Sequence, residues 1–345
     1  MAKVLITGIT GQDGAFLARS LLARGDEVWG AMRRGSTSKT GRLKELGIRE
    51  DVKFCTLEVT EFANVQSVLN EIRPDYIFNL AAQSFVADSF QFPHYTSDVN
   101  YMGVLNILEA MRILKLDAKL YQASTSEMYG DVLEKPQSEK TPFNPLSPYA
   151  VSKLAAHSLV VNYRQAYNMF ATSGILFNHE SELRGYEFVT RKITSWLART
   201  KLQNAEAMPL GNLSSVRDWG YAPEYTDMMI KMLDHDKPDD FVISTNTEYT
   251  VRDFLFMAAQ EVGFDPVSEG EGLEEKVHDR KTGRLIAYVD PRYFRASDVV
   301  YLRGDNTKAQ EILGWKPEVL APEIARRMAI YDLKKAAVDM PGLQA

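Results

Sequence analysis

Short β-branched runs alternate with amphipathic helical patterns along the first half of the chain. The run KVLITG ends at Gly8, and apolar positions at helical spacing follow it as far as Gly25. Helical patterns separate most of the further strand-like runs, which are EVWGAM, VKFCTLE, YIFNLAA, KLYQAST and FATSGILFN. Strands that alternate with helices predict right-handed crossovers, and therefore an α/β fold with a doubly wound parallel sheet covered on both faces.

This alternation ends after residue 178. Residues 179–220 read as polar loops around one helix, FVTRKITSWLARTK, and residues 267–284 are charged with few apolar positions. The run FVISTN near residue 241 indicates one more strand of the sheet. We therefore predict a nucleotide-binding domain over residues 1–178, with returning segments near 217–247. A smaller, discontinuous substrate domain is expected within residues 179–345.

The composition excludes several classes of protein. The 345 residues include 40 basic and 46 acidic ones, and a net charge of −6 argues against a nucleic-acid surface. One cysteine excludes an internal disulfide and is compatible with a reducing cytosol. No apolar run approaches the length of a membrane span, and the chain begins with a strand instead of a signal peptide. We expect a cytoplasmic globular protein without a membrane partner.

Three glycines stand between the first strand and the first helix. They are Gly8, Gly11 and Gly14 in the stretch GITGQDG. Glycines at this place permit a tight turn and let backbone N–H groups at the helix N-terminus approach a pyrophosphate. A glycine-rich turn alone can be a plain tight loop, but its position after the first strand of an alternating chain predicts a Rossmann-type dinucleotide site.

The end of the second strand bears on the choice of dinucleotide. EVWGAM runs into Arg33 and Arg34, and no acidic residue stands at its tip. An acidic residue there would bind the ribose 2′-hydroxyl of NAD, whereas arginine accommodates the 2′-phosphate of NADP. Arginines at loop mouths are also common as solvated surface residues. The pattern favours NADP.

A tyrosine and a lysine stand four residues apart in SPYAVSK. Tyr149 and Lys153 would lie on one face of a helix, where an ammonium stabilises a phenolate and makes the tyrosine a usable base. Such a pair is more often packing than chemistry. Here it follows a dinucleotide turn, and Thr125 lies at the end of a strand, where open parallel sheets carry their active sites. Together they predict a catalytic set.

Several longer stretches carry a family resemblance. They are GITGQDG, LAAQSFV, YQASTSEMYG, PFNPLSPYAVSKLAAH, ILFNHES, RGYEFVTRKI, RDWGYAPEY and GWKPEV. With them the chain resembles the extended short-chain dehydrogenase/reductase family and, within it, the GDP-mannose 4,6-dehydratases over nearly its full length. Any one stretch would be a weak signal, whereas the combination is specific.

The resemblance implies roles for three sets of residues. The catalytic positions are Thr125, Glu127, Tyr149 and Lys153. The NADP contacts are Gly8, Thr10, Gly11, Gln12, Asp13, Arg33, Glu58, Val59, Leu80, Ala81, Ala82, Gln83, Ser84, Tyr95, Lys153, His179 and Arg184. The contacts to the nucleotide sugar are Asn178, Lys192, Arg217 and Arg295. No metal site is expected, because no Cys–His or His–carboxylate cluster has ligand spacing.

The resemblance also implies a lyase reaction in which Glu127 has a chemical role. Tyr149 would take the C4 hydroxyl proton of GDP-mannose while hydride moves to NADP, and the new ketone would acidify the C5 proton. Glu127 would remove that proton, and Glu127 or Thr125 would protonate the departing C6 hydroxyl. Return of the hydride to C6 would give GDP-4-keto-6-deoxymannose. A reductase or epimerase needs no such acid, so Glu127 favours the dehydratase.

The sequence departs from the family pattern near the predicted site. The departures are Glu58 and Val59, Asn144 and Leu146 in PFNPLSPY, Glu182 and Leu183 in NHESELRG, and Tyr221 in RDWGYA. Two alternative activities therefore stay open: the same reaction on GDP-manno-heptose, and a GDP-4-keto-sugar reductase or epimerase. A non-catalytic nucleotide-sugar-binding protein is a third possibility, which intact Tyr149 and Lys153 disfavour. The resemblance further implies a homodimer or homotetramer, with residues 33–39 as a plausible contact.

Overall fold

The computed structural model describes residues 1–35, 39–294 and 299–338. The chain divides into two compact units. The first comprises Met1–Phe177, Ala222–Ile243 and Gly304–Lys316, and the second comprises Asn178–Tyr221, Ser244–Arg303 and Pro317–Ala345. The returning segment was expected near 217–247 and is Ala222–Ile243 in the structure. Gly304–Lys316 also returns to the first unit, although no sequence pattern indicated it, because its short helix offers only a few apolar positions.

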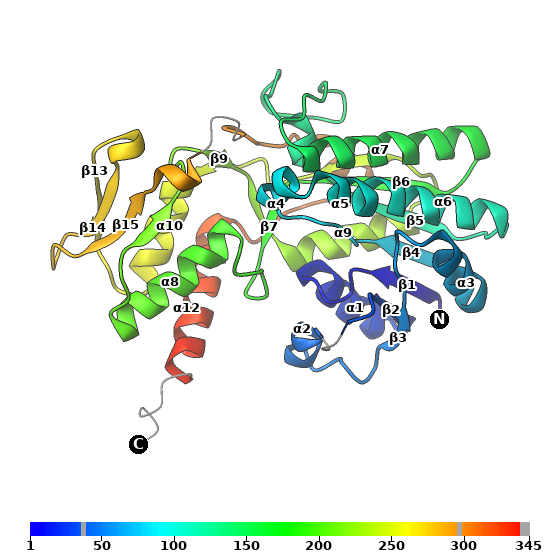
Figure 1. Cartoon of the computed structure of the whole chain (residues 1–345), viewed down its shortest axis with the longest axis horizontal. Coiled ribbons are helices and arrows are strands. Elements are labelled where there is room, and N and C mark those ends of the chain that lie inside the picture. Colours follow the sequence, from blue (N-terminus) through cyan, green and yellow to red (C-terminus); the bar gives the residue numbers. More distant parts are fainter. Residues whose placement is uncertain (36–38, 295–298, 339–345) are drawn as a thin grey trace. The chain divides into compact units, whose positions relative to one another are not determined.

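A seven-stranded parallel sheet forms the centre of the first unit, in the order β11-β6-β5-β4-β1-β2-β3 (Figure 1). Its strands are β1 (Lys3–Thr7), β2 (Glu27–Met32), β3 (Lys53–Thr56), β4 (Tyr76–Asn79), β5 (Lys119–Thr125), β6 (Ala171–Leu176) and β11 (Asp240–Ile243). The winding direction reverses between β1 and β4, which is where open α/β sheets bind ligands at the carboxyl ends of their strands. The predicted doubly wound fold is confirmed.

Helices cover both faces of this sheet because successive strand residues point to opposite sides. On β1, Val4 and Ile6 belong to the apolar core that contains α1 and α9, whereas Leu5 packs into the core under α3, α6 and α7. The helices of this unit are α1 (Gln12–Arg24), α2 (Gly41–Glu45), α3 (Phe62–Ile72), α4 (Val86–Gln91), α5 (Pro93–Ser97), α6 (Gly103–Ile113), α7 (Pro148–Tyr167), α9 (Ala222–Asp234) and α11 (Thr307–Leu313). A π-helical turn, Asp98–Met102, joins α5 to α6.

The second unit has its own core between three helices and a four-stranded sheet in the order β13-β14-β15-β8. The helices are α8 (Val189–Gln203), α10 (Val251–Glu261) and α12 (Ala321–Val338). The sheet strands are β8 (Met208–Leu210), β13 (Pro266–Glu269), β14 (Lys276–Asp279) and β15 (Leu285–Val289), and the pairs β7 (Asn178–Glu180) with β10 (Trp219–Tyr221) and β9 (Val216–Arg217) with β12 (Tyr249–Thr250) complete the unit.

The sequence reading placed no strands in the charged segment 267–284, where the structure has the β13–β14 hairpin. Val277 is fully buried there, but its neighbours Lys276 and His278 are not. The other buried residue of β14 is the polar Asp279, and one buried apolar position in a four-residue strand is too short a pattern to separate a strand from a loop.

Candidate active site

The glycine-rich turn forms a cradle at the N-terminus of α1. Gly8 has a φ of 71°, and a Cβ at this position would lie only 2.9 Å from the carbonyl carbon of Leu80, the residue that follows β4. The amide of Gly11 donates to the carbonyl of Gly8 at 2.9 Å and closes the turn. A Cβ on Gly14 would lie 2.5 Å from the Gly8 oxygen. The turn is therefore tight and leaves the helix N-terminus open to an anion, which fits a dinucleotide pyrophosphate.

Side chains outside the turn fix its shape. Arg42 on α2 donates to the carbonyl of Thr10 at 2.9 Å, a contact that sequence reasoning missed. Gln12 is buried and donates to Asp13 at 3.0 Å. The polar residue Arg42 stands alone in a short loop-like segment, and no local spacing connects it with Thr10, 32 residues earlier.

Two residues predicted to contact the cofactor lie together beyond β2. The guanidinium of Arg33 donates to the hydroxyl of Tyr95, and both side chains are exposed. The arginine therefore stays accessible at the end of its strand. Beyond β3, the amide of Glu58 donates to Asn64 at 2.7 Å, and Asn106 on α6 donates to the carbonyl of Val59 at 2.8 Å. These bonds hold the Glu58–Val59 main chain in place.

The segment Leu80–Ser84 leaves the carboxyl end of β4 beside the cradle. Its main chain is fixed by side chains, because Asn100 accepts from the amide of Gln83 at 2.9 Å and donates to its carbonyl at 3.1 Å. The Oε1 atom of Gln83 is buried and has no hydrogen-bond partner among the described residues. A buried acceptor without a donor is a second feature that fits a bound polar ligand here.

Thr125 and Glu127 lie at the carboxyl end of β5. Thr125 caps the short 3₁₀ helix Ser126–Tyr129, and its hydroxyl accepts from the amide of Glu127 at 3.2 Å. Both side chains are half-buried. The chain needs no acid to make this turn, since the cap is supplied by Thr125. The fold therefore places Glu127 directly after the residue that caps this turn.

Helix α7 packs against β5 and against the 3₁₀ helix, which brings the predicted catalytic elements together. Ser147 caps α7 by accepting from the amide of Ala150 at 3.1 Å, and Pro148 occupies its first position. Tyr149 and Lys153 follow on one face and are both buried. His157, one turn further, bonds to Ser124 at 3.0 Å and ties α7 to β5. Burial lowers the pKa of His157, which favours the neutral ring.

Lys153 is a buried ammonium with a backbone partner. Its Nζ donates to the carbonyl of Ala123 at 2.6 Å. Burial lowers the pKa of Lys153 to about 8. The side chain is therefore still mostly charged at neutral pH, but it loses its proton within a range that an assay can reach.

The predicted sugar contacts that the structure describes belong to the second unit. The Oδ1 atom of Asn178 is buried and has no hydrogen-bond partner among the described residues. Lys192 donates to the carbonyl of Pro209 at 2.5 Å and lies 4.3 Å from the ring centre of Tyr293, and burial lowers its pKa. Arg217 donates to the carbonyl of Val216 at 2.9 Å. The fourth predicted contact, Arg295, lies outside the described residues.

The two cofactor contacts predicted after β6 are also in the second unit. His179 on β7 is buried. Arg184 pairs with Glu180 at 3.1 Å, and its guanidinium lies 3.6 Å from the ring centre of Phe188. The structure therefore holds Arg184 by a carboxylate and an aromatic face. The roles of all these residues stay predictions.

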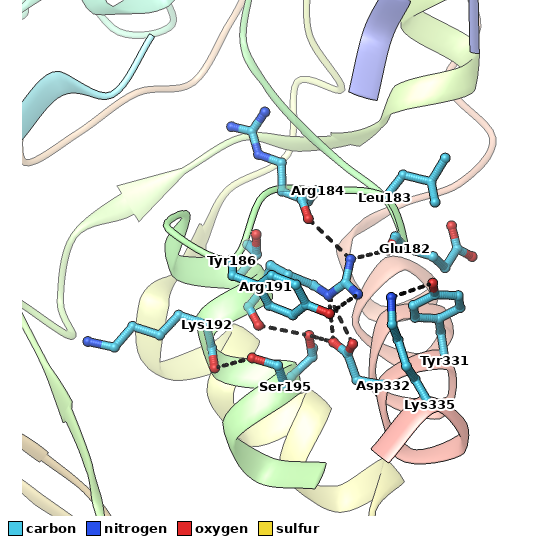
Figure 2. Close-up of polar contacts among 12 residues, drawn as sticks. Glu182, Leu183, Arg184, Tyr186, Arg191, Lys192, Ser195, Tyr331, Asp332 and Lys335 are labelled. Carbon is cyan, nitrogen blue, oxygen red and sulfur yellow. Dashed lines mark hydrogen bonds and ion pairs between the residues drawn. The ribbon is translucent and has the colours of Figure 1, made fainter. Parts of the chain in front are cut away.

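A buried arginine organises the loop that carries Arg184 (Figure 2). Arg191 pairs with Asp332 on α12 at 2.8 Å, and its guanidinium donates to the carbonyls of Glu182 and Arg184. The rings of Tyr186 and Tyr331 lie 4.7 and 5.0 Å from it. A cavity of about 490 Å³ lies beside this cluster, and the residues that line it are Tyr186, Lys192, Ser195, Trp196, Arg199, Gln203, Asp332, Lys335 and Ala336.

Two of the departures from the family pattern contact one another. The hydroxyl of Tyr221 donates to the carboxylate of Glu182 at 3.4 Å, and the guanidinium of Arg327 lies 4.8 Å from the Tyr221 ring. Burial, followed by the charge of Glu182, raises the pKa of Tyr221. Two positions that lie 39 residues apart in the sequence therefore meet in one local contact.

Within residues 1–35, 39–294 and 299–338, no group of three or more His, Cys, Asp or Glu side chains is arranged to hold a metal ion. In the same residues, every helix is too short or too polar to cross a bilayer.

Solved structures share this fold. UDP-glucose 4-epimerase from Thermotoga maritima has a TM-score of 0.81 at 23% identity, over 96% of this chain and 99% of that chain. The same enzyme from Bifidobacterium longum, in complex with NAD+ and UDP, has a TM-score of 0.80 at 20% identity, over 96% and 98%. RMD from Pseudomonas aeruginosa, complexed with NADPH, has 0.73 at 21%, over 97% and 100%. The doubly wound parallel sheet and these likenesses define the fold class, a Rossmann-type α/β protein.

Sequence comparison identifies the family within this fold class. The family described as GDP-mannose 4,6 dehydratase matches residues 5–328. Relatives named GDP-mannose 4,6-dehydratase are 46% identical in Vibrio cholerae, over 97% of this chain and 94% of the relative, and 45% identical in Homo sapiens, over 96% and 91%. The chain belongs to the GDP-mannose 4,6-dehydratase family.

Proposed function

We propose that this protein is an NADP-dependent hydro-lyase that converts GDP-mannose to GDP-4-keto-6-deoxymannose. Membership of the dehydratase family over residues 5–328 is the observation that carries the proposal. The position of Glu127 beside Thr125 supports it, because an elimination needs an acid–base group that a simple reduction does not.

The residues of the first unit have distinct tasks in this proposal. The cradle at Gly8–Asp13 and the segment Leu80–Ser84 would hold the cofactor, with Arg33 at the 2′-phosphate. A bound nicotinamide supplies reversible hydride acceptance, which no side chain can provide. The ammonium of Lys153 stabilises Tyr149 as a phenolate, and this phenolate takes the proton of the C4 hydroxyl and becomes a neutral phenol. Glu127 takes the C5 proton, and Glu127 or Thr125 delivers a proton to the leaving C6 hydroxyl.

Glu127→Gln tests the elimination step. The amide keeps the size of the side chain but cannot accept a proton, so water loss should fall by roughly 10²- to 10⁴-fold while GDP-mannose still binds. Mass spectrometry of the product measures the loss of one water, and proton NMR in deuterated solvent measures exchange at C5. Thr125→Ser is the matched control and should retain most activity, since the hydroxyl remains. Unchanged turnover and C5 exchange in Glu127→Gln would remove the main support for the proposal.

The choice of NADP is tested at the end of β2. Replacing Arg33 and Arg34 by alanine should weaken NADP binding far more than NAD binding, because each lost charge-assisted bond to the 2′-phosphate costs roughly 1.5–3 kcal/mol. Isothermal titration with both dinucleotides gives the comparison. Lys44→Ala, an exposed cation on α2, is the control for general charge. Extraction of mainly NAD(H) from the purified protein would contradict the assignment.

A competition experiment tests which sugar the enzyme uses. Equal concentrations of GDP-mannose and GDP-manno-heptose are incubated with the enzyme, and the loss of 4-hydroxyl substrate is followed for each. We expect GDP-mannose to be used with the higher kcat/KM. A preference for the heptose would keep the reaction and change the substrate, and it would direct attention to the Glu182–Tyr221 contact.

A further inference from the structure

A line of buried side-chain hydrogen bonds crosses the parallel sheet of the first unit. Thr7 on β1, Asn79 on β4 and Gln122 on β5 stand opposite one another in register, and each is at most 3% exposed. The Thr7 hydroxyl donates to Asn79 Oδ1 at 2.6 Å, and Asn79 Nδ2 donates to Gln122 Oε1 at 2.7 Å. Gln122 Nε2 then donates to the carbonyl of Ala123 at 3.0 Å.

Both ends of this line reach the candidate active site. At one end, the hydroxyl of Thr7 accepts from the amides of Leu80 and Ala81 at 3.1 and 3.0 Å. At the other end, the Ala123 carbonyl that accepts from Gln122 also accepts from Lys153 Nζ at 2.6 Å. The line therefore joins the segment predicted to hold the cofactor to the predicted catalytic lysine.

The backbone amides of Leu80 and Ala81 determine which group donates and which accepts in each hydrogen bond of this line. Backbone N–H groups can only donate, so the Thr7 hydroxyl accepts from them and gives its single proton to Asn79. The Asn79 amide must then present its oxygen to Thr7 and its nitrogen to Gln122. The same logic turns the nitrogen of Gln122 toward the Ala123 carbonyl. In a buried site a reversed amide would leave two polar groups unpaired, which costs about 1–3 kcal/mol for each group.

The consequence concerns the surroundings of Lys153. Gln122 directs its NH₂ group, and not its oxygen, at the Ala123 carbonyl. The acceptor that the Lys153 ammonium contacts on β5 is therefore this carbonyl. Burial is what lowers the pKa of Lys153. The other titratable or charged side chains on α7 and on the elements that pack around it are Asp88, His94, Tyr95, Asp98, Tyr101, Glu109, Arg112, Lys119, Tyr121, Glu127, Tyr129, Tyr149, His157, Tyr163, Arg164 and Tyr167.

We propose that Thr7, Asn79 and Gln122 are positioning residues that act as a directional relay, which fixes the Leu80–Ala81 main chain and the acceptor that Lys153 meets. The functional meaning of this relay rests on the catalytic role proposed for Lys153. The arrangement itself is a property of the chain, and it can be measured without substrate.

Reversal of the Gln122 amide is the sharpest test. In Asn79→Asp the carboxylate can accept from Thr7 but cannot donate, so Gln122 must turn its nitrogen toward position 79 and its oxygen toward the Ala123 carbonyl, which places a second acceptor beside the one that Lys153 meets. An added acceptor raises the pKa of the ammonium. The buried carboxylate raises it as well, through space. Asn79→Asp combined with Gln122→Met keeps the new charge but contains no amide that can turn, and it is the matched control.

The pKa of Lys153 is read directly by NMR. Protein labelled with ¹³C at the lysine ε-carbon is titrated, and the resonance is assigned by its absence from Lys153→Met. We expect Asn79→Asp to raise the pKa of Lys153 by about 1 more than the double variant does. An equal pKa in both variants would show that charge alone acts, and would overturn the relay.

A second, uncharged pair keeps the test decisive if buried aspartate prevents folding. Thr7→Val is isosteric but removes the hydroxyl that orients Asn79, whereas Thr7→Ser retains it. Thr7→Val should shift the Lys153 resonance and lower kcat roughly 10-fold or more with less change in KM, and Thr7→Ser should restore both. A Lys153 resonance unmoved in Thr7→Val would refute the relay. Absence of water loss from GDP-mannose in the unmodified protein would instead refute the proposed function.

Discussion

At the scale of single residues, the site contains a lysine whose burial is unfavourable for stability. Lys153 is 4% exposed and has a pKa of about 8 instead of 10.5. The unfolded chain therefore binds more protons than the native chain between these two values. Stability rises with pH across that window and is lost again as the pH falls through the native pKa.

Lys153→Met should therefore be more stable than the unmodified protein at neutral pH. The gain is expected to be roughly 2–3 kcal/mol below pH 8, because methionine removes the buried charge and also one backbone hydrogen bond. It should shrink as the pH approaches 10. Urea denaturation at several pH values measures the difference, and Lys44→Met on the exposed side of α2 should show no such trend. A gain independent of pH would mean that the charge of Lys153 is not its cause.

Residues whose chemistry depends on local spacing could be predicted from the sequence. Tyr149 and Lys153 are one helical turn apart, and the cradle glycines lie within seven residues, so their pattern is visible without the fold. Asn106 is different: it holds the carbonyl of Val59, 47 residues earlier. Thr7, Asn79 and Gln122 meet only because β1, β4 and β5 are neighbours. Their one signal is an amide or hydroxyl inside an apolar strand, which local patterns leave unexplained.

At the scale of elements, the contact between the first turn and α1 should be sensitive to a single methyl group. Gly14→Ala would place a Cβ 2.5 Å from the Gly8 oxygen and 2.7 Å from the Ile9 Cα, both of which are backbone atoms. We expect a loss of about 2 kcal/mol or more in the free energy of unfolding, and loss of bound dinucleotide.

Gly41→Ala is the matched control for this prediction. Gly41 begins α2, has no positive φ, and would meet nothing within 4 Å of a new Cβ. Alanine there should be neutral or stabilising by about 0.5–1 kcal/mol, since it raises helix propensity. Chemical denaturation and quantification of co-purified dinucleotide measure both variants. Equal behaviour of the two substitutions would show that the turn is less tightly packed than the structure indicates.

At the scale of the whole molecule, the parallel sheet could be predicted because apolar strand-like runs alternate with longer amphipathic helices such as α1, α6 and α7. The second unit could not, since it combines strands of two to five residues with discontinuous segments. The assignment of nucleotide and sugar binding to separate domains stays a prediction, as does the homo-oligomeric state.

The complete turnover should leave the oxidation state of the sugar unchanged overall. If one site oxidises C4 and later reduces C6, deuterium placed at C4 of GDP-mannose should appear at C6 of the product. NMR of the isolated keto sugar measures the transfer, and no added reductant should be consumed. Recovery of C6 without label, or stoichiometric loss of reduced cofactor, would favour a reductase instead.

The hydrogen bonds that Arg191 donates to the loop backbone have a consequence for substitutions in this loop. The guanidinium holds residues 182 and 184 by their carbonyl oxygens, which every amino acid possesses. These two hydrogen bonds therefore do not depend on which side chains residues 182 and 184 carry. The Arg191–Asp332 pair fixes the backbone of this loop, whereas the chemistry of the loop depends on its side chains. A library randomised at 182, 183 and 221 above this fixed pair is the natural starting point for directed evolution toward other nucleotide sugars.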